Sequence, residues 1–378
     1  MSDGQLAIVG LGSVGSMALW QASKLSESSV GFDSHAPAHP RSAVGGDSRL
    51  FRMTYRDDNN YFPILQESEP LWRELEAESG HEILTQCGGL SIGAPDGPYI
   101  PALLASIGRT DAPHRVLSQA EMAETYPQHN LREGECAILD PRAGFLRTDR
   151  AVTSAIDVAQ ANGATVMSNT AIDEIREDPD GVILSSGANS WKFDRVIVAS
   201  GSWSKRLLPQ PLRARVKPHR IFLSWFVARD ASQFAPERFP IFIRISGNRS
   251  LYGTPSLDQV TVKATLDGRS AATLDPSDLA RELTEAEVAE SVETVAEFLP
   301  DLIPNIVRSD AYPDLYTSDG AALLGAMPQS QRIYYATGFS GTGFKMASGF
   351  GAIAASEVLG RRHNHEIDFL RPARFSAA

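Results

Sequence analysis

The stretch Gln5-Leu6-Ala7-Ile8-Val9-Gly10-Leu11-Gly12-Ser13-Val14-Gly15 decides the fold of this chain. Five residues of strand length and mainly apolar character run into G-x-G-x-x-G, and residues 16–25 then have the character of a helix. A second short apolar segment, residues 30–32, ends at Asp33. This order predicts a βαβ unit with the glycine fingerprint of a dinucleotide site at its strand-to-helix turn.

Each glycine of the fingerprint has a physical task. Gly10 permits the tight turn, Gly12 lets a pyrophosphate approach the backbone, and Gly15 lets the helix pack close to the strand. The amino end of the helix supplies free N–H donors for the phosphates. Asp33 can accept hydrogen bonds from a ribose 2′-hydroxyl, and its charge disfavours a 2′-phosphate. We therefore expect a bound dinucleotide; a glycine turn without a ligand is the alternative.

Length and composition exclude several classes of protein. The 378 residues, 42% of them hydrophobic, suffice for two domains with their own cores. The net charge of −11 argues against nucleic acid or an anionic membrane surface as a partner. There is no apolar run long enough to span a bilayer and no signal peptide, so we expect a cytoplasmic protein. Cys87 and Cys136 lack metal or redox spacing, and we expect two reduced thiols and no metal site.

The rest of the chain shows two patterns of predicted secondary structure. Apolar periodicity predicts helices over residues 61–79, 118–126, 150–162, 279–299 and 346–359. Strands are predicted over residues 86–93, 164–167, 171–176, 181–185, 194–201 and 332–337. Four alternating segments without helices between them predict a separate antiparallel sheet: 216–228, 241–245, 250–253 and 259–265. We expect an α/β fold with a Rossmann-like domain and a second domain built on an antiparallel sheet.

Four cationic residues stand out. Arg49 and Arg52 follow a glycine-containing stretch, and in a helical turn they would share a face. Lys263 alternates with Val262 on a strand, where a lysine is seldom core filler. Lys345 follows a glycine-rich turn and opens a helix, a position that disfavours a cation unless an anion lies nearby. Plain solvent exposure is the alternative for all of them.

These motifs together resemble a known family. The fingerprint, Gly46-Asp47-Ser48-Arg49-Leu50-Phe51-Arg52, the strand lysine and Gly338-Phe339-Ser340-Gly341-Thr342-Gly343-Phe344-Lys345 are similar to those of FAD-dependent amine oxidases of the monomeric sarcosine oxidase and N-methyltryptophan oxidase family. The resemblance covers nearly the whole chain and implies FAD rather than NAD. It implies an FAD-binding domain of residues 1–84, 145–214 and 310–378, and a substrate domain of residues 85–144 and 215–309. It also implies a monomer that acts on a small amine with O₂.

The resemblance further implies residue roles. Arg52 and Lys345 would hold the substrate carboxylate, and Lys263 would lie over the flavin and activate oxygen. Tyr316 and Asp267 are candidates to favour the neutral amine. The cofactor-binding set that we expect is Gly10, Gly12, Ser13, Val14, Gly15, Asp33, Ser34, Arg41, Ser42, Asp47, Ser48, Arg49, Ile172, Ser200, Gly201, Trp203, Gly341, Thr342, Gly343, Phe344 and Lys345.

Three departures from the family pattern matter. Asp314 stands where relatives carry the cysteine that attaches the flavin, so FAD should be held without a covalent bond. Thr342 and Asp267 stand where the sarcosine-type enzymes carry histidines. Fructosyl-amino-acid oxidases are similar in having an acid at the position of Asp267 that contacts the sugar. A simple turn at Asp267-Gly268 is the alternative.

The expected reaction is oxidation of an N-substituted amino acid, with a fructosyl amino acid favoured over sarcosine or another N-methyl amino acid. Hydride passes from the substrate C–H to flavin N5, the imine is hydrolysed, and O₂ is reduced to H₂O₂. The alternatives are a flavin-dependent dehydrogenase that passes electrons to a carrier, an NAD-dependent dehydrogenase, and a non-catalytic FAD-binding subunit.

Overall fold

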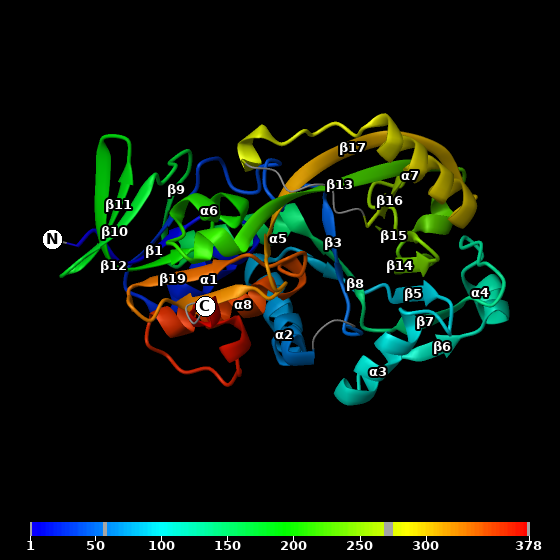
Figure 1. Ribbon diagram of the computed structural model, residues 1–378, viewed down its shortest axis with the longest axis horizontal. Coiled ribbons are helices and arrows are strands. Elements are labelled where there is room, and N and C mark those ends of the chain that lie inside the picture. The colour runs from blue at the N-terminus through cyan, green and yellow to red at the C-terminus, as the bar shows by residue number, and fades with distance from the viewer. Residues whose placement is uncertain (1, 56–58, 268–274, 376–378) are drawn as a thin grey trace.

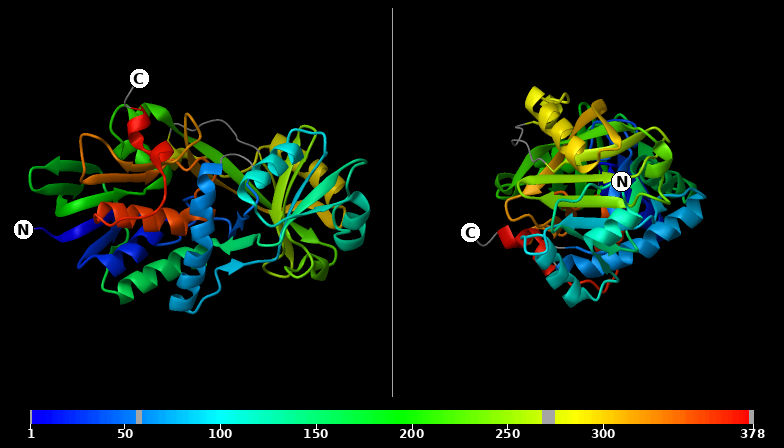
Figure 2. Two further views of the ribbon diagram at one scale, coloured as in Figure 1. Left: turned by 90° about the horizontal axis from the view of Figure 1, so that it is seen from below. Right: turned by 90° about the vertical axis from the view of Figure 1, so that its right-hand side faces the viewer.

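The structure, a computed structural model, describes residues 2–55, 59–267 and 275–375. It contains two large sheets that lie in two lobes, with helix α2 (Phe62–Ser79) standing between them (Figure 2, left). Strands β13 (Val216–Ala228) and β17 (Leu302–Thr317) run from one lobe into the other (Figure 1). The expected α/β fold with a second, mainly antiparallel sheet is confirmed.

The first sheet has a parallel centre. Strand β1 (Gly4–Val9) pairs with β2 (Ser29–Phe32) on one side and with β12 (Asn189–Val198) on the other. β9 (Thr165–Met167) and β19 (Ile333–Thr337) extend the parallel part beyond β2 and β12. The antiparallel strands at its edges are β10 (Glu174–Asp178), β11 (Gly181–Ser186) and β18 (Leu323–Ala326). Because β1, β2, β9 and β12 run the same way, their carboxyl ends meet at one edge of the sheet.

Helices bury the first sheet on one face. The fingerprint helix α1 (Ser13–Leu25) packs between α8 (Ala347–Val358) and α5 (Thr148–Ala161). Helix α2 adds Trp72, which is fully buried, and ends at Gly80 in a left-handed conformation, as its sequence predicts. The short helix α6 (Ser204–Leu207) follows β12. None of the helices in the described ranges is long and apolar enough to cross a bilayer.

The second sheet has the order β17-β13-β16-β15-β14-β5-β7-β6. Its other strands are β16 (Thr261–Leu266), β15 (Arg249–Thr254), β14 (Ile241–Ser246), β5 (Gly89–Gly93), β7 (Cys136–Asp140) and β6 (Arg115–Leu117). Every pair is antiparallel except β14 with β5. Val262 and Ala264 of β16 face a core that includes Val295 and Phe298 of helix α7 (Glu285–Phe298). The opposite face of β16 therefore looks toward the first lobe.

Two parts of the second lobe differ from the sequence prediction. Residues 96–144 contain not one helix but two, α3 (Ile100–Thr110) and α4 (Gln119–Thr125). Pro101 is compatible with α3 because it lies in the first turn, where its missing N–H costs nothing. Strand β17 was not predicted because its outward half is polar; pairing along β13 holds it in place.

The domain boundaries stay a prediction. The strand order shows to which of the two sheets each predicted segment contributes. Strands β5, β7 and β6 from residues 85–144 join the second sheet. Strand β17 belongs to the second sheet along its length, so the expected boundary at 310 falls inside a strand. A small sheet of β3 (Ser48–Phe51), β8 (Gly144–Arg147) and β4 (Leu84–Thr85) lies between the two larger ones.

Candidate active site

The glycine turn has the geometry that its sequence predicts. Gly10 has φ +95°, and a Cβ there would lie 2.5 Å from Cα of Ser200. A Cβ on Gly15 would lie 1.8 Å from the Gly10 carbonyl oxygen, so helix and strand meet there closely. A Cβ on Gly12 would meet only Val44, at 3.9 Å, which leaves the backbone at Gly12 open to a ligand. The turn thus fits a pyrophosphate at the amino end of α1.

Asp33, at the end of β2, closes this turn. Its Oδ2 accepts the N–H of Leu11 at 2.8 Å, and its Oδ1 accepts the N–H of His35 at 3.0 Å. The side chain is only 8% exposed, and His39 Nε2 lies 3.6 Å from Oδ1. A carboxylate so placed has remaining lone pairs for ribose hydroxyls.

A cavity of about 310 Å³ opens at the carboxyl ends of β1, β2 and β12. This size is within the usual range of cofactor sites. The expected cofactor residues that line it are Gly10, Gly12, Ser13, Val14, Asp33, Ser34, Ser42, Arg49, Ile172, Ser200, Gly201, Trp203, Gly341, Gly343 and Phe344. The expected ones that do not line it are Gly15, Arg41, Asp47, Ser48, Thr342 and Lys345.

The sequence prediction missed part of this lining. His39, Thr170, Asp173, Ser202 and Arg206 also face the cavity. Thr170 and Asp173 follow β9, the parallel neighbour of β2, and the edge rule for parallel strands could have found them. Nothing in the local sequence marks the others.

Arg49 lies on strand β3, not in a helical turn, so the expectation that it shares a face with Arg52 is wrong. Strand β3 ends at Phe51, so Arg52 lies directly after the strand and the two arginines do not share a helical turn. The Arg49 guanidinium donates to the carbonyls of Ser48, Ala43 and Gly45 at 2.7–2.8 Å. Burial lowers its pKa, and Asp314 is among the groups that oppose this shift. Arg49 is therefore a buried cation that faces the cavity.

Lys263 lies at the centre of β16 and is 3% exposed. Its Nζ donates to the carbonyl oxygens of Gly46 at 3.0 Å and Ser48 at 2.7 Å. Burial, reinforced by Arg49, lowers the pKa of Lys263 well below its usual value, while Asp47 opposes the shift. The Lys263 side chain thus extends from the face of the second sheet that is turned toward the first lobe, on the side opposite α7.

Arg52 and Lys345 meet at one aromatic ring. The ring centre of Tyr55 lies 4.6 Å from Nζ of Lys345 and 5.6 Å from Cζ of Arg52. Lys345, in the 3₁₀ turn η6 (Phe344–Met346), is 8% exposed, and its carbonyl accepts the Trp72 Nε1–H at 3.2 Å. Nη1 of Arg52 is buried and has no hydrogen-bond partner among the described residues. Asp140 accepts the N–H groups of the two residues after Arg52 and so holds this segment.

Of four further predicted positions, only Asp314 lines the cavity. It lies opposite His219 on β13, and burial raises the pKa of Asp314 to about 6. Tyr316 packs its ring 4.7 Å from that of His219, and its hydroxyl lies beside Gly341. Asp267 is exposed, donates its backbone N–H to Ser250, and is not part of the lining. Thr342 Oγ1 donates to the Phe339 carbonyl within its own loop.

The chain is similar to known proteins in both sequence and structure. The sequence matches the DAO family, described as FAD dependent oxidoreductase, over residues 5–357. It is 28% identical to monomeric sarcosine oxidase of Streptomyces avermitilis over 98% of this chain and 97% of that protein. It is 26% identical to N-methyl-L-tryptophan oxidase of Yersinia pestis, over 99% and 100%. The structure superposes on NikD, described as an unusual amino acid oxidase, with a TM-score of 0.87 and 20% identity over 98% of each chain.

The family match decides between the two dinucleotides that the glycine fingerprint allowed. The open backbone at Gly12, the acid at the end of β2 and the cavity at the sheet edge all fit the flavin dinucleotide. An NAD-dependent dehydrogenase is excluded. The chain belongs to the DAO family of FAD dependent oxidoreductases, and FAD is its cofactor.

Proposed function

We propose that the protein is an oxidase of N-substituted amino acids, R–NH–CHR′–COO⁻, with O₂ as the electron acceptor. One observation carries the proposal: Arg52 and Lys345, 293 residues apart in the numbering (345 − 52), converge on Tyr55, and Nη1 of Arg52 is buried with no partner in the part of the chain that the structure describes. A buried unpaired guanidinium nitrogen is costly, and a substrate carboxylate would satisfy it. The oxidases of N-methyl amino acids among the relatives support the same class.

Arg52 and Lys345 bind and orient the substrate. The planar fork of arginine suits a carboxylate, and the lysine adds a second charge from another direction. Trp72 and Asp140 hold the backbone at the two cations, so the site is formed before substrate arrives. Binding the carboxylate at two points would fix the adjacent C–H bond relative to the cofactor, so that binding energy is used to orient the reacting groups.

The surrounding cations also select the form of the amine that reacts. Arg52 and Lys345 both lie against the ring of Tyr55, and their like charge disfavours a protonated amine beside them. The substrate would therefore react as the neutral amine without an obligatory protein base. Tyr316, beside Gly341, is the candidate hydroxyl to assist it. When bound in the cavity, FAD would supply the redox chemistry, namely acceptance of a hydride from the substrate and reduction of O₂.

Lys263 is the group that we assign to the oxygen step. The Gly46 and Ser48 carbonyls hold its ammonium in place, and a fixed cation in a buried site stabilises negative charge that develops on oxygen. An enzyme that passes electrons to a carrier has no use for such a cation. Formation of H₂O₂ in air, at one equivalent for each amine oxidised, tests this assignment; its absence would favour the dehydrogenase.

We propose that FAD is held without a covalent bond. Asp314 cannot form a thioether, and Cys87 and Cys136 do not line the cavity. Acid precipitation should leave all the flavin in the supernatant. Flavin that stays with the pellet would contradict the proposal. We also propose that the protein is a monomer, as the name of the Streptomyces relative states for that protein, which sedimentation would test.

A panel of substrates would identify the N-substituent that the enzyme prefers. Burial raises the pKa of Tyr252, and the negative charge of Asp267 adds to this shift, so Asp267 lies near Tyr252. This proximity supports a fructosyl substituent, although Asp267 itself is exposed. Anaerobic flavin bleaching with sarcosine, N-methyltryptophan, proline, fructosyl-glycine and fructosyl-valine separates the classes. Faster bleaching by the fructosyl compounds, lost in Asp267→Asn, supports the sugar; bleaching by N-methyl compounds that is unchanged in this variant refutes it. Failure of every amine would favour a non-catalytic FAD-binding subunit.

A further inference from the structure

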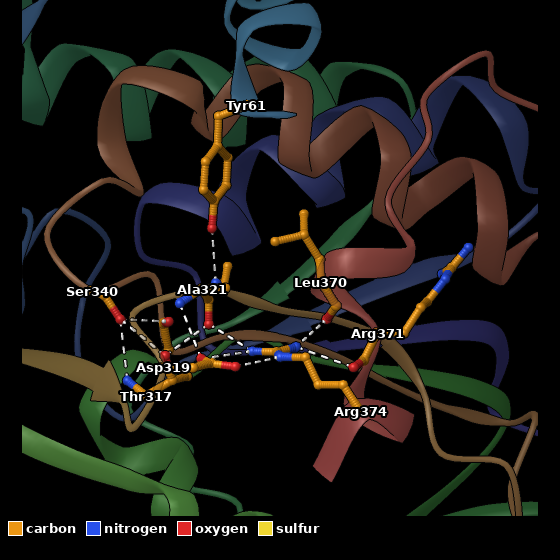
Figure 3. Close-up of polar contacts among 10 residues, drawn as sticks. Tyr61, Thr317, Asp319, Ala321, Ser340, Leu370, Arg371 and Arg374 are labelled. Atoms are coloured by element: carbon orange, nitrogen blue, oxygen red, sulfur yellow. Dashed lines mark hydrogen bonds and ion pairs between the residues drawn. The ribbon is translucent and has the colours of Figure 1, made fainter. Parts of the chain in front are cut away.

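The C-terminal segment after α8 contacts the residues that follow strand β17, Asp319 and Ala321. Its last described element is the 3₁₀ turn η8 (Pro372–Phe375), which carries Arg374 (Figure 3). The guanidinium of Arg374 donates to both carboxylate oxygens of Asp319, at 2.8 and 3.3 Å, and to the carbonyl of Ala321 at 2.7 Å. It also donates to the carbonyls of Leu370 and Arg371. All five N–H groups of Arg374 are therefore used.

The carbonyl of Ala321 connects this arginine to Thr317, the last residue of β17. Thr317 Oγ1 donates to the same Ala321 oxygen at 2.8 Å and lies 3.2 Å from Oγ of Ser340. The Thr317 N–H also donates to that hydroxyl at 3.1 Å. Figure 3 shows the resulting chain of contacts from Arg374 through the Ala321 carbonyl and Thr317 to Ser340.

Ser340 is the strained residue of the glycine-rich loop. It has φ +52°, a left-handed conformation that a residue with a side chain adopts at a cost of about 1 kcal/mol or more. Its neighbours Phe339 and Gly341 both line the FAD cavity. Its own N–H donates to the Leu315 carbonyl at 3.1 Å. The contacts from Thr317 thus stabilise the backbone that the cofactor meets.

We propose that Arg374 is a positioning residue for FAD. By holding Asp319 and Ala321 it fixes Thr317, and through Thr317 it keeps the loop of residues 338–343 in the conformation that lines the cavity. The C-terminal segment then sets how slowly FAD leaves the enzyme. The inference rests on FAD as the cofactor and not on the substrate, so it stands or falls separately from amine oxidation.

A general role in folding is the alternative, and the chain offers a matched control. Arg371, three residues earlier, donates to both carboxylate oxygens of Glu357 at 2.6 Å. Its side chain points away from the Thr317–Ser340 contacts (Figure 3). Arg371→Gln removes a two-point ion pair from the same segment without touching this path.

The experiment measures FAD release from the purified holoenzymes, followed as the rise in flavin fluorescence after dilution. One net hydrogen bond predicts release about 3- to 10-fold faster in both Arg374→Gln and Thr317→Val. Thr317→Ser, which keeps the hydroxyl, should release FAD at the wild-type rate. Arg371→Gln should lower the melting temperature but leave the release rate unchanged.

A double variant tests whether the two residues act along one path. Arg374→Gln combined with Thr317→Val should release FAD no faster than the faster single variant, because both act through the Ala321 carbonyl. Wild-type release in both single variants would overturn the proposal. So would an equal acceleration in Arg371→Gln, or effects of the two substitutions that multiply.

Discussion

Replacing Lys263 by methionine tests the oxygen step most directly. Methionine has a similar length, a flexible side chain and no charge, so it can replace Lys263 between its strand partners Trp225 and Thr254. A unit positive charge about 4 Å from developing negative charge, at an effective dielectric constant of about 20, contributes roughly 4 kcal/mol. This corresponds to reoxidation of the reduced flavin by O₂ that is slower by about 10³-fold. Anaerobic reduction by substrate should be nearly unchanged.

The assay separates the two half-reactions. Stopped-flow mixing with substrate under argon gives the rate of flavin reduction, and mixing of the reduced enzyme with oxygenated buffer gives the rate of reoxidation. Lys263→Gln serves as a control because its amide can still donate to the Gly46 and Ser48 carbonyls. If charge is the cause, the glutamine variant is as slow as the methionine variant. Equal losses in both half-reactions would refute the assignment.

The pH dependence provides a second check on the same residue. Burial lowers the pKa of Lys263, and only the protonated amine carries the stabilising charge. The wild-type reoxidation rate should therefore fall as pH rises through this lowered pKa. In Lys263→Met the rate should be low and should lack this transition. A wild-type rate that rises over the same range would contradict a cationic role.

Three further substitutions have outcomes set by the structure. Arg52→Ala should weaken substrate binding by roughly 2–5 kcal/mol, measured by anaerobic titration of the flavin spectrum, because it removes one of the two cations at Tyr55 together with its buried Nη1 group; unchanged affinity would exclude the carboxylate role. Burial raises the pKa of Asp314 to about 6, so its contribution to stability is present below the unfolded value and lost as pH rises through about 6. Asp314→Asn should remove that loss, at most about 3 kcal/mol, from melting curves between about pH 4 and pH 7. Burial would raise the pKa of Glu357, but hydrogen bonds from Arg371, Tyr334 and His363 hold it at about 2. The resulting stability is present above the unfolded pKa and lost as pH falls toward about 2, and Glu357→Gln should flatten this acid limb.

Sequence reasoning succeeded where a feature depends on neighbours along the chain. The glycine turn, the helix α1 and the acid at the end of β2 follow from backbone sterics and periodicity within about thirty residues. The alternation that puts Val262 into the core and Lys263 on the other face is likewise local to one strand. The family resemblance extended these local signals to FAD.

Sequence reasoning failed where distant segments decide. Arg49 and Arg52 were expected on one helical face, but pairing of β3 with β8, nearly 100 residues later, makes residues 48–51 a strand that ends just before Arg52. Strand β17 has a polar half that no periodicity identifies, and β13 supplies its partners. The contact of Arg374 with Asp319 carries no motif at either end.

The sequence by itself thus determined the dinucleotide turn, the class of fold and the identity of the cations. Only the tertiary structure decided that Arg52 and Lys345 share the ring of Tyr55 and that the C-terminal segment connects, through Ala321 and Thr317, to Ser340. The physical reason is range. Dihedral preferences and side-chain periodicity act over a few residues, whereas a site is formed by burial, which brings together groups far apart in the chain.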